Sequence, residues 1–299
     1  MYRIAQMFSV AAYNFRSWRR NPRIIITFAL AFVLCFLLSD KVVKFAKEYK
    51  TTMQIVEAFV WTFEDGNSVL LSSLLLILLF ADMPFITTGT PLYLLRIDRK
   101  TWLAGQMIYI TATTCLYMVF ILVSTSLICM SNSFIGNMWS ETAAILGYSG
   151  AGQKLLLPSE VKTMEMSTPY ACMATILLLM LLYSLLMAFI MLIFNIRKGQ
   201  RAGAVSVFVF SLFGLVLNPK LINSVLQLPD RLLYKANVAF GWISPLNQAT
   251  YHMHNFGYDL LPRLWQTYAV FGILILACFI VALRSVRRYN FNFTGTENG

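Results

Sequence analysis

The sequence is poor in charge. Charged residues make up 12% of its 299 residues and hydrophobic residues 58%, whereas a soluble domain has about 25% charged residues. A soluble domain of this length has too small an interior to bury so much apolar surface. The composition therefore excludes a soluble domain. It predicts an all-α integral membrane protein in which lipid solvates most of the chain.

Residues that bind metals or transfer protons are also scarce. The only two histidines, His252 and His254, are two positions apart, and residues at that spacing do not face each other on a helix. This favours hydrogen bonding at an interface over metal binding. No cluster of acidic, histidine and cysteine residues marks a membrane-embedded enzyme. We therefore predict no catalytic, metal-binding or cofactor-binding residue in this chain.

The five cysteines are an odd and scattered set without the spacing of metal ligands. Most are expected to behave as small buried hydrophobic residues. Cys129 and Cys172 lie at the outer ends of two predicted spans. Whether these two pair stays open, because sequence gives no distance between them.

The sequence contains part of a nucleotide-binding motif but not all of it. The stretch Gly147-Tyr-Ser-Gly-Ala-Gly152 has the glycine spacing of a phosphate loop, but Gln153 stands where that loop requires lysine. No strand pattern precedes it. The chain is therefore not expected to hydrolyse ATP by itself.

Residues 1–22 predict an amphipathic helix lying in the membrane interface on the cytoplasmic side. Its apolar stripe recurs at helical spacing and consists of Ile4, Phe8, Ala11, Phe15 and Trp18. Polar and basic residues occupy the rest of the helix. Asn21-Pro22 should end it and turn the chain into the bilayer.

Six apolar runs predict a transmembrane domain over residues 23–283. They cover roughly residues 23–39, 68–86, 102–128, 171–196, 202–217 and 266–283. The fifth and sixth are short for a hydrocarbon core of about 30 Å. Residues 284–299 form a cytoplasmic tail.

Arginine distribution predicts the orientation. With the N-terminus inside, 12 of the 14 arginines fall on the cytoplasmic side, as the positive-inside rule requires. Both termini are then cytoplasmic, in a multi-pass protein of the cell (plasma) membrane. The net charge of +11 thus reflects membrane orientation, and no nucleic-acid partner is expected.

Three outer segments follow from this topology, over residues 40–67, 129–170 and 218–265. The last two contain glycines, prolines and apolar patches too short to span a bilayer. These patches predict short re-entrant helices in the outer leaflet.

Asp82 interrupts an apolar run near the inner end of the second predicted span. A carboxylate at membrane depth is costly and usually pairs or lines a water-filled path. A structural ion pair with an arginine of the inner surface is the favoured interpretation. A role in gating or substrate passage is the alternative.

The inner loop at residues 88–101 is small, basic and amphipathic. It offers a cytoplasmic partner a docking surface, together with the N-terminal helix. This loop, the Arg-Asn-Pro-Arg23 start of the first span, the six spans and the Ile-Ser-Pro-Leu-Asn-Gln248 segment resemble the permease subunits of type-2 ABC exporters. The likeness covers the whole chain.

The resemblance implies a function and a set of partners. In that family the inner loop is a coupling helix that fits a cleft on a cytoplasmic ATPase, and ATP binds that partner. By resemblance the coupling role falls on Arg96, Asp98, Arg99, Lys100 and Trp102. A second permease chain, identical or related, would complete the substrate path. The chain would then be a transport subunit of an exporter, embedded in lipid and without its own ATPase site.

Two other classes stay open. A secondary transporter is expected to show paired broken spans and several intramembrane charges, whereas the sequence marks only Asp82. A structural or sensory membrane subunit would need no bound ATPase. The cargo of an exporter could be lipid, peptide, glycan or drug.

Overall fold

The computed structural model describes residues 2–85, 96–154, 160–217, 233–257 and 259–289. The chain is mostly helical. Among the described residues, β1 (Met53–Gln54) pairs in parallel with β2 (Ser133–Phe134) in a two-stranded sheet. The helical content predicted for an all-α protein is confirmed.

Four helices of the described chain are long and apolar enough to span a membrane. They are α2 (Pro22–Glu48), α6 (Arg99–Cys129), α10 (Pro169–Lys198) and α15 (Leu264–Ser285). These helices suggest a membrane-embedded protein. Their positions agree with four of the six predicted spans.

The other two predicted spans take a different form. The second comprises α4 (Gly66–Ile77) and η2 (Leu78–Phe80), and it meets α3 (Glu57–Phe63) at a bend of 93°. The fifth is α11 (Gln200–Val216), an apolar helix of only 17 residues. Six full spans are therefore not confirmed. The described residues contain four helices that could span a membrane, or five if the bent pair counts as one span.

Local sequence sets the ends of these helices. The Asn21 side chain accepts a hydrogen bond from the Arg23 amide, and Pro22 occupies the first turn, so α2 begins where the sequence predicts. It continues past the predicted end at residue 39, where Lys44 and Asp40 form an i,i+4 ion pair. Gly199, at φ +89°, separates α10 from α11.

Helix α10 is the centre of the molecule. Of its most apolar stretch 72% is buried inside the protein, against 22% for α2 and 17% for α15. It packs against α11, α15, α6, α3 and α4. Hydroxyl groups add polar ties between these helices: the Ser73 and Ser184 hydroxyls lie 2.8 Å apart, and the Tyr117 hydroxyl donates to the Ser72 carbonyl at 2.9 Å.

Shorter helices occupy the connecting segments. These are α7 (Glu141–Tyr148), α8 (Ala151–Lys154), α9 (Val161–Met166), α13 (Leu233–Ile243), α14 (Pro245–Gln248) and η5 (Tyr251–Met253). The N-terminal α1 (Tyr2–Arg16) is followed by η1 (Ser17–Arg20), and α15 by η6 (Val286–Arg288). A re-entrant path of α7, α8, α9 or α13 is not confirmed. Among the described residues, the bent pair is α3–α4, which the sequence did not single out.

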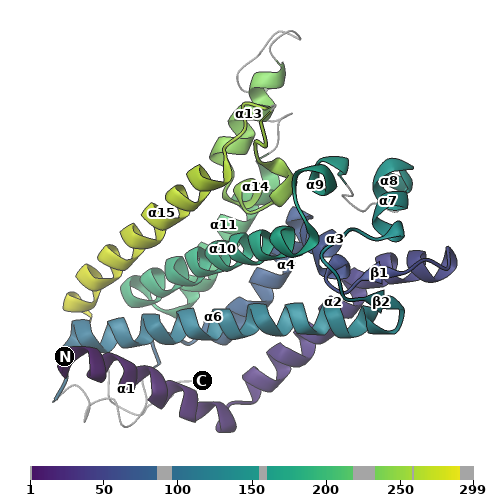
Figure 1. The fold of residues 1–299 in the computed structure, drawn as a ribbon. Coiled ribbons are helices and arrows are strands. Elements are labelled where there is room, and N and C mark those ends of the chain that lie inside the picture. The colour runs from purple at the N-terminus through teal and green to yellow at the C-terminus, as the bar shows by residue number, and fades with distance from the viewer. Residues whose placement is uncertain (1, 86–95, 155–159, 218–232, 258, 290–299) are drawn as a thin grey trace.

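The long helices give the molecule two ends. The start of α6 and the ends of α10 and α15 lie together at the left of Figure 1, opposite α3, α7 and α9. We call the first the basic end, since Arg99, Arg197, Arg284 and Arg287 lie there. We call the second the far end.

Candidate functional site

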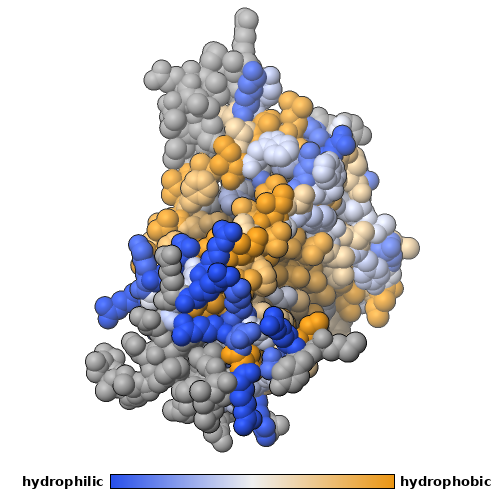
Figure 2. Space-filling view, turned by 90° about the vertical axis from the view of Figure 1, so that its left-hand side faces the viewer, coloured by the Kyte–Doolittle hydropathy of each residue, from blue (hydrophilic) through white to orange (hydrophobic). Residues whose placement is uncertain are grey.

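The basic end gathers charge from segments far apart in the sequence. Its exposed cations include Lys100 at the start of α6, Arg197 and Lys198 at the end of α10, and Arg284 and Arg287 on α15 and η6. Figure 2, which looks onto this end, shows hydrophilic residues clustered beside apolar surface. This is the arrangement expected where membrane helices leave the lipid.

Asp82 forms an ion pair with Arg23 at this end. The pair joins the first turn of α2 to the residues that follow η2. The neighbouring backbone is held by Asn195 of α10, whose side-chain amide donates to the Met83 carbonyl at 2.6 Å and to the Ala81 carbonyl at 3.3 Å. An ion pair with an arginine is the contact that the favoured sequence interpretation expects for Asp82, and its place on the inner side of the membrane stays a prediction.

The N-terminal helix α1 packs along the first half of α6. The Asn14 amide donates to Gln106 Oε1 at 2.7 Å in a buried contact, and the Trp18 indole donates to the Tyr109 hydroxyl at 2.7 Å. Gly105 allows the close approach, because a Cβ there would lie 2.7 Å from the Met7 carbonyl oxygen. Helix α1 is therefore part of the helical core at this end.

The packing of α1 on α6 leaves part of the apolar stripe of the N-terminal helix exposed and partly covers the rest. Phe8 is 58% exposed, which suits an interfacial position. Phe15 and Trp18 are half-buried, and the Phe15 ring lies 4.8 Å from that of Tyr109. Phe15 and Trp18 therefore pack partly against α6, and the interfacial position expected for them stays a prediction.

The predicted coupling loop is described only at its end, because residues 86–95 lie outside the described chain. Arg96, Asp98, Arg99 and Lys100 are exposed. Asp98 pairs with Arg3 of α1 at 3.8 Å, and the Gln6 amide of α1 donates to the Arg96 carbonyl at 3.5 Å. The loop end and α1 therefore form one continuous surface.

Arg99 and Trp102 have roles within the chain itself. The Arg99 guanidinium donates to the backbone carbonyls of Arg287 and Tyr289, which ties η6 to the start of α6. Trp102 is only 2% exposed. It shares a helix face with Gly105, Gln106 and Tyr109, the residues that α1 covers. Trp102 therefore does not present its indole to a partner in this structure, which corrects the contact role predicted for it.

The far end holds a buried polar network that sequence reasoning missed. Ser140 donates two hydrogen bonds to the buried Glu57 carboxylate. The Ser140 amide donates to Oε1 at 2.7 Å, and the Ser140 hydroxyl donates to Oε2 at 2.5 Å. Glu64, fully buried at the α3–α4 bend, accepts from the Thr163 hydroxyl. Its Oε2 has no hydrogen-bond partner among the described residues. The one signal in the sequence was two glutamates at i and i+7 in an apolar stretch.

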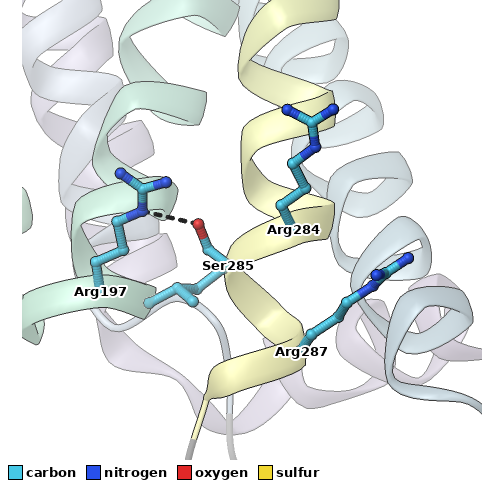
Figure 3. Close-up of a pocket in the computed structure, with 5 residues that line it drawn as sticks. Arg197, Arg284, Ser285 and Arg287 are labelled. Carbon is cyan, nitrogen blue, oxygen red and sulfur yellow. Dashed lines mark hydrogen bonds between the residues drawn. The ribbon is translucent and has the colours of Figure 1, made fainter.

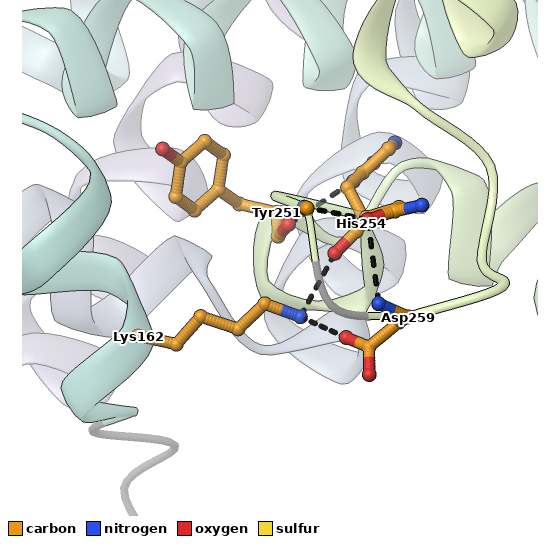
Figure 4. Close-up of polar contacts among 6 residues, drawn as sticks. Lys162, Tyr251, His254 and Asp259 are labelled. Carbon is orange, nitrogen blue, oxygen red and sulfur yellow. Dashed lines mark hydrogen bonds and ion pairs between the residues drawn. The ribbon is translucent and has the colours of Figure 1, made fainter.

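Lys162 and His254 form further polar contacts at the far end (Figure 4). Lys162 of α9 donates to the His254 carbonyl at 2.9 Å and pairs with Asp259 at 2.5 Å, which joins α9 to the segment before α15. The His254 ring contacts the Tyr251 carbonyl and the Thr267 hydroxyl, each at 3.0 Å. Burial lowers the pKa of both His254 and His252, so both rings are neutral near pH 7.

Metal and nucleotide chemistry find no support in the described part of the chain. It contains no group of three or more His, Cys, Asp or Glu residues placed to hold a metal ion. The segment from Gly147 to Gly152 runs from the end of α7 into α8 and follows a helix, not a strand. All five cysteines are free, Cys129 and Cys172 included.

Comparison with known proteins found no matching family model, no similar curated protein and no similar solved structure. Functional inference therefore depends on the chain's own geometry.

Proposed function

We propose that this chain is the membrane-embedded permease subunit of an ATP-driven exporter. It would work as a dimer of permease chains, identical or related, with a separate cytoplasmic ATPase. The observation that carries the proposal is the docking of α1 on α6 beside the exposed residues Arg96 and Lys100. Together they offer a partner a cationic surface attached to the longest helix of the described chain.

The route of coupling follows α6. The buried Asn14–Gln106 hydrogen bond ties α1 to α6. A displacement of α1 or of the loop end would therefore also move the start of α6. At the other end, Cys129 of α6 donates to the Ile55 carbonyl at 3.3 Å, and β2 pairs with β1. Both β1 and Ile55 directly precede the bent α3–α4 pair. In this proposal, work done at the basic end reaches the bend at the far end through one helix.

Orientation is part of the proposal. Placing the basic end in the cytoplasm of a cell with the chain in its plasma membrane follows the arginine bias. It also presents Arg96 and Lys100 on the side where ATP is available.

Co-purification tests the proposal. Arg96→Glu with Lys100→Glu reverses two exposed charges, neither of which has an ion-pair partner among the described residues. We expect the double variant to insert normally but to lose a bound ATPase, at about 2 kcal/mol or more for a central contact. The matched control is Lys198→Glu with Arg201→Glu, two exposed cations elsewhere on this end. Equal ATPase retention by both variants and the wild type would refute the docking surface.

One observation favours the alternative function, that of an ion-coupled secondary transporter. Glu64 is fully buried at the 93° bend, with one carboxylate oxygen unpartnered among the described residues, and broken helices with buried acids mark ion sites in such transporters. Proton flux into liposomes that hold this chain alone, abolished by Glu64→Gln, would favour this function. No flux without an ATPase would favour the exporter.

A further inference from the structure

A cavity of about 580 Å³ lies at the basic end, between the last turns of α10 and α15. It is lined by Ile196, Arg197, Arg284, Ser285 and Arg287. Figure 3 shows Arg197 on α10 facing the arm of α15 and η6 that carries the other two arginines. The volume falls within the range of about 300–1,000 Å³ that is typical of small-molecule sites.

None of the three arginines is neutralised by a carboxylate of the described chain, and Ser285 orients one of them, Arg197. Arg197 donates through Nε to the Ser285 hydroxyl at 2.8 Å, which holds one edge of its guanidinium and leaves the terminal nitrogens free to donate elsewhere. None of the three forms an ion pair with a carboxylate of the described chain. Three guanidinium groups around one cavity repel each other and call for an anion. Their planar donor forks suit the oxygens of a phosphate.

The surface leading to the cavity indicates where that phosphate comes from. Ile273, Leu276 and Ile280 are exposed on α15, and with Arg284 they recur at the spacing of a single helix face. The apolar strip on α15 therefore ends at an arginine of the cavity.

The length of the strip matches one lipid leaflet. Ile273 and Arg284 are eleven positions apart, or about 16 Å along a helix. Half of a hydrocarbon core of about 30 Å is about 15 Å. An acyl chain lying along Ile273, Leu276 and Ile280 would bring its headgroup to Arg284 and Arg287. A free phosphate ion would gain nothing from this strip.

We propose that the cavity binds the phosphate of an anionic phospholipid whose acyl chains lie along the exposed face of α15. Arg197, Arg284 and Arg287 would hold the phosphate oxygens, with Ser285 fixing Arg197. The bound lipid would also join the ends of α10 and α15. This inference requires the chain to be membrane-embedded, but it does not depend on transport or on an ATPase partner.

Native mass spectrometry of the purified full chain tests the site with phosphatidylglycerol as probe. Replacing Arg197, Arg284 and Arg287 by Gln removes three cations from the cavity. The control replaces Arg16, Lys198 and Arg201 by Gln, which removes three exposed cations outside it. At about fivefold per basic residue near an anionic membrane surface, we expect the loss of three arginines to lower the phosphatidylglycerol affinity of the cavity variant by about 100-fold. The control should stay within about threefold of the wild type.

Two further measurements identify the source of the phosphate. Phosphatidylcholine has the same phosphate but adds a choline cation, which the arginines repel. It should bind the wild type less tightly than phosphatidylglycerol and should lose less affinity in the cavity variant. Inorganic phosphate should not raise the thermal stability of the lipid-free protein. Equal loss of phosphatidylglycerol in the cavity and control variants would overturn the site. Stabilisation by inorganic phosphate without a preference for phosphatidylglycerol would overturn the lipid assignment.

Discussion

Arg23 and Asp82 form an ion pair that joins the start of α2 to the chain beyond η2, across 59 positions of sequence. Their side chains are 53% and 40% exposed. The pair is therefore partly solvated, so it should orient the two segments more than it stabilises them. The ion pair with Arg23 explains how a carboxylate is tolerated within an apolar run.

The first prediction concerns this pair. Asp82→Asn and Arg23→Gln should each lower the thermal stability of the detergent-purified protein by about 1 kcal/mol or less. The double variant should cost no more than the costlier single variant, because both remove one interaction. Thermal unfolding and cellular abundance are the measurements. Additive losses would deny the pairing, and normal abundance with altered transport would point to gating by Asp82.

The second prediction tests the docking of α1. Gly105→Ala places a Cβ 2.7 Å from both the Met7 carbonyl oxygen and Val10 Cβ. Overpacking of this kind costs about 1–3 kcal/mol, so the variant should unfold at lower temperature and release α1 to protease. Gly272→Ala in α15 is the matched control, because its Cβ meets nothing within 4 Å. Both variants gain similar helix propensity. Unchanged protection of α1 in Gly105→Ala would contradict the packing argument.

The third prediction concerns topology. With the five native cysteines replaced, single cysteines at positions 44 and 235 should react with an impermeant maleimide added outside intact cells. Single cysteines at positions 100 and 287 should react only after permeabilisation. The native residues Lys44, Lys235, Lys100 and Arg287 are all exposed, so access depends on the side of the membrane alone. Labelling of position 100 from outside would reverse the orientation.

The fourth prediction follows from His254. Burial lowers its pKa in the folded protein, so below pH about 6.5 the unfolded chain takes up a proton that the folded chain resists. The contribution of His254 to stability is therefore complete above pH about 6.5. It falls by up to about 1.4 kcal/mol per pH unit as the pH drops toward the lowered pKa.

His254→Asn should reduce this loss of stability between pH about 7.5 and 5.5, measured by thermal unfolding. His252, whose pKa burial also lowers, should account for part of the loss that remains. Thr267→Val is the matched control, because it removes the hydrogen bond to His254 Nε2 but keeps the titrating ring. It should lower stability at both pH values and leave the slope as in the wild type. A wild-type slope in His254→Asn would assign the pH dependence to another group.

Several features of the fold follow from local sequence. Long apolar runs predict α2, α6, α10 and α15, because a helix that satisfies its own backbone is the form such a run takes in lipid. Asn21 and Pro22 predict the start of α2 through capping and a fixed φ angle. Each of these depends on residues adjacent in the chain.

The candidate site was less accessible to prediction. Periodicity shows that α1 has an apolar stripe, but not whether lipid or α6 covers it. For the same reason Trp102 was assigned to a partner's pocket, although it is buried within this chain. Apolar surface is non-directional and buries against whatever lies nearest.

Composition and apolar pattern alone predict a helical, apolar chain with a strong bias in the placement of arginine. Tertiary packing brings Asp82 to Arg23 and Glu64 to Thr163, and it places Arg197, Arg284 and Arg287 around one cavity. Helix formation and lipid partitioning are sums over neighbouring residues, so a local pattern specifies them. Contacts between segments tens of residues apart depend on how the helices pack, and no local pattern encodes that arrangement.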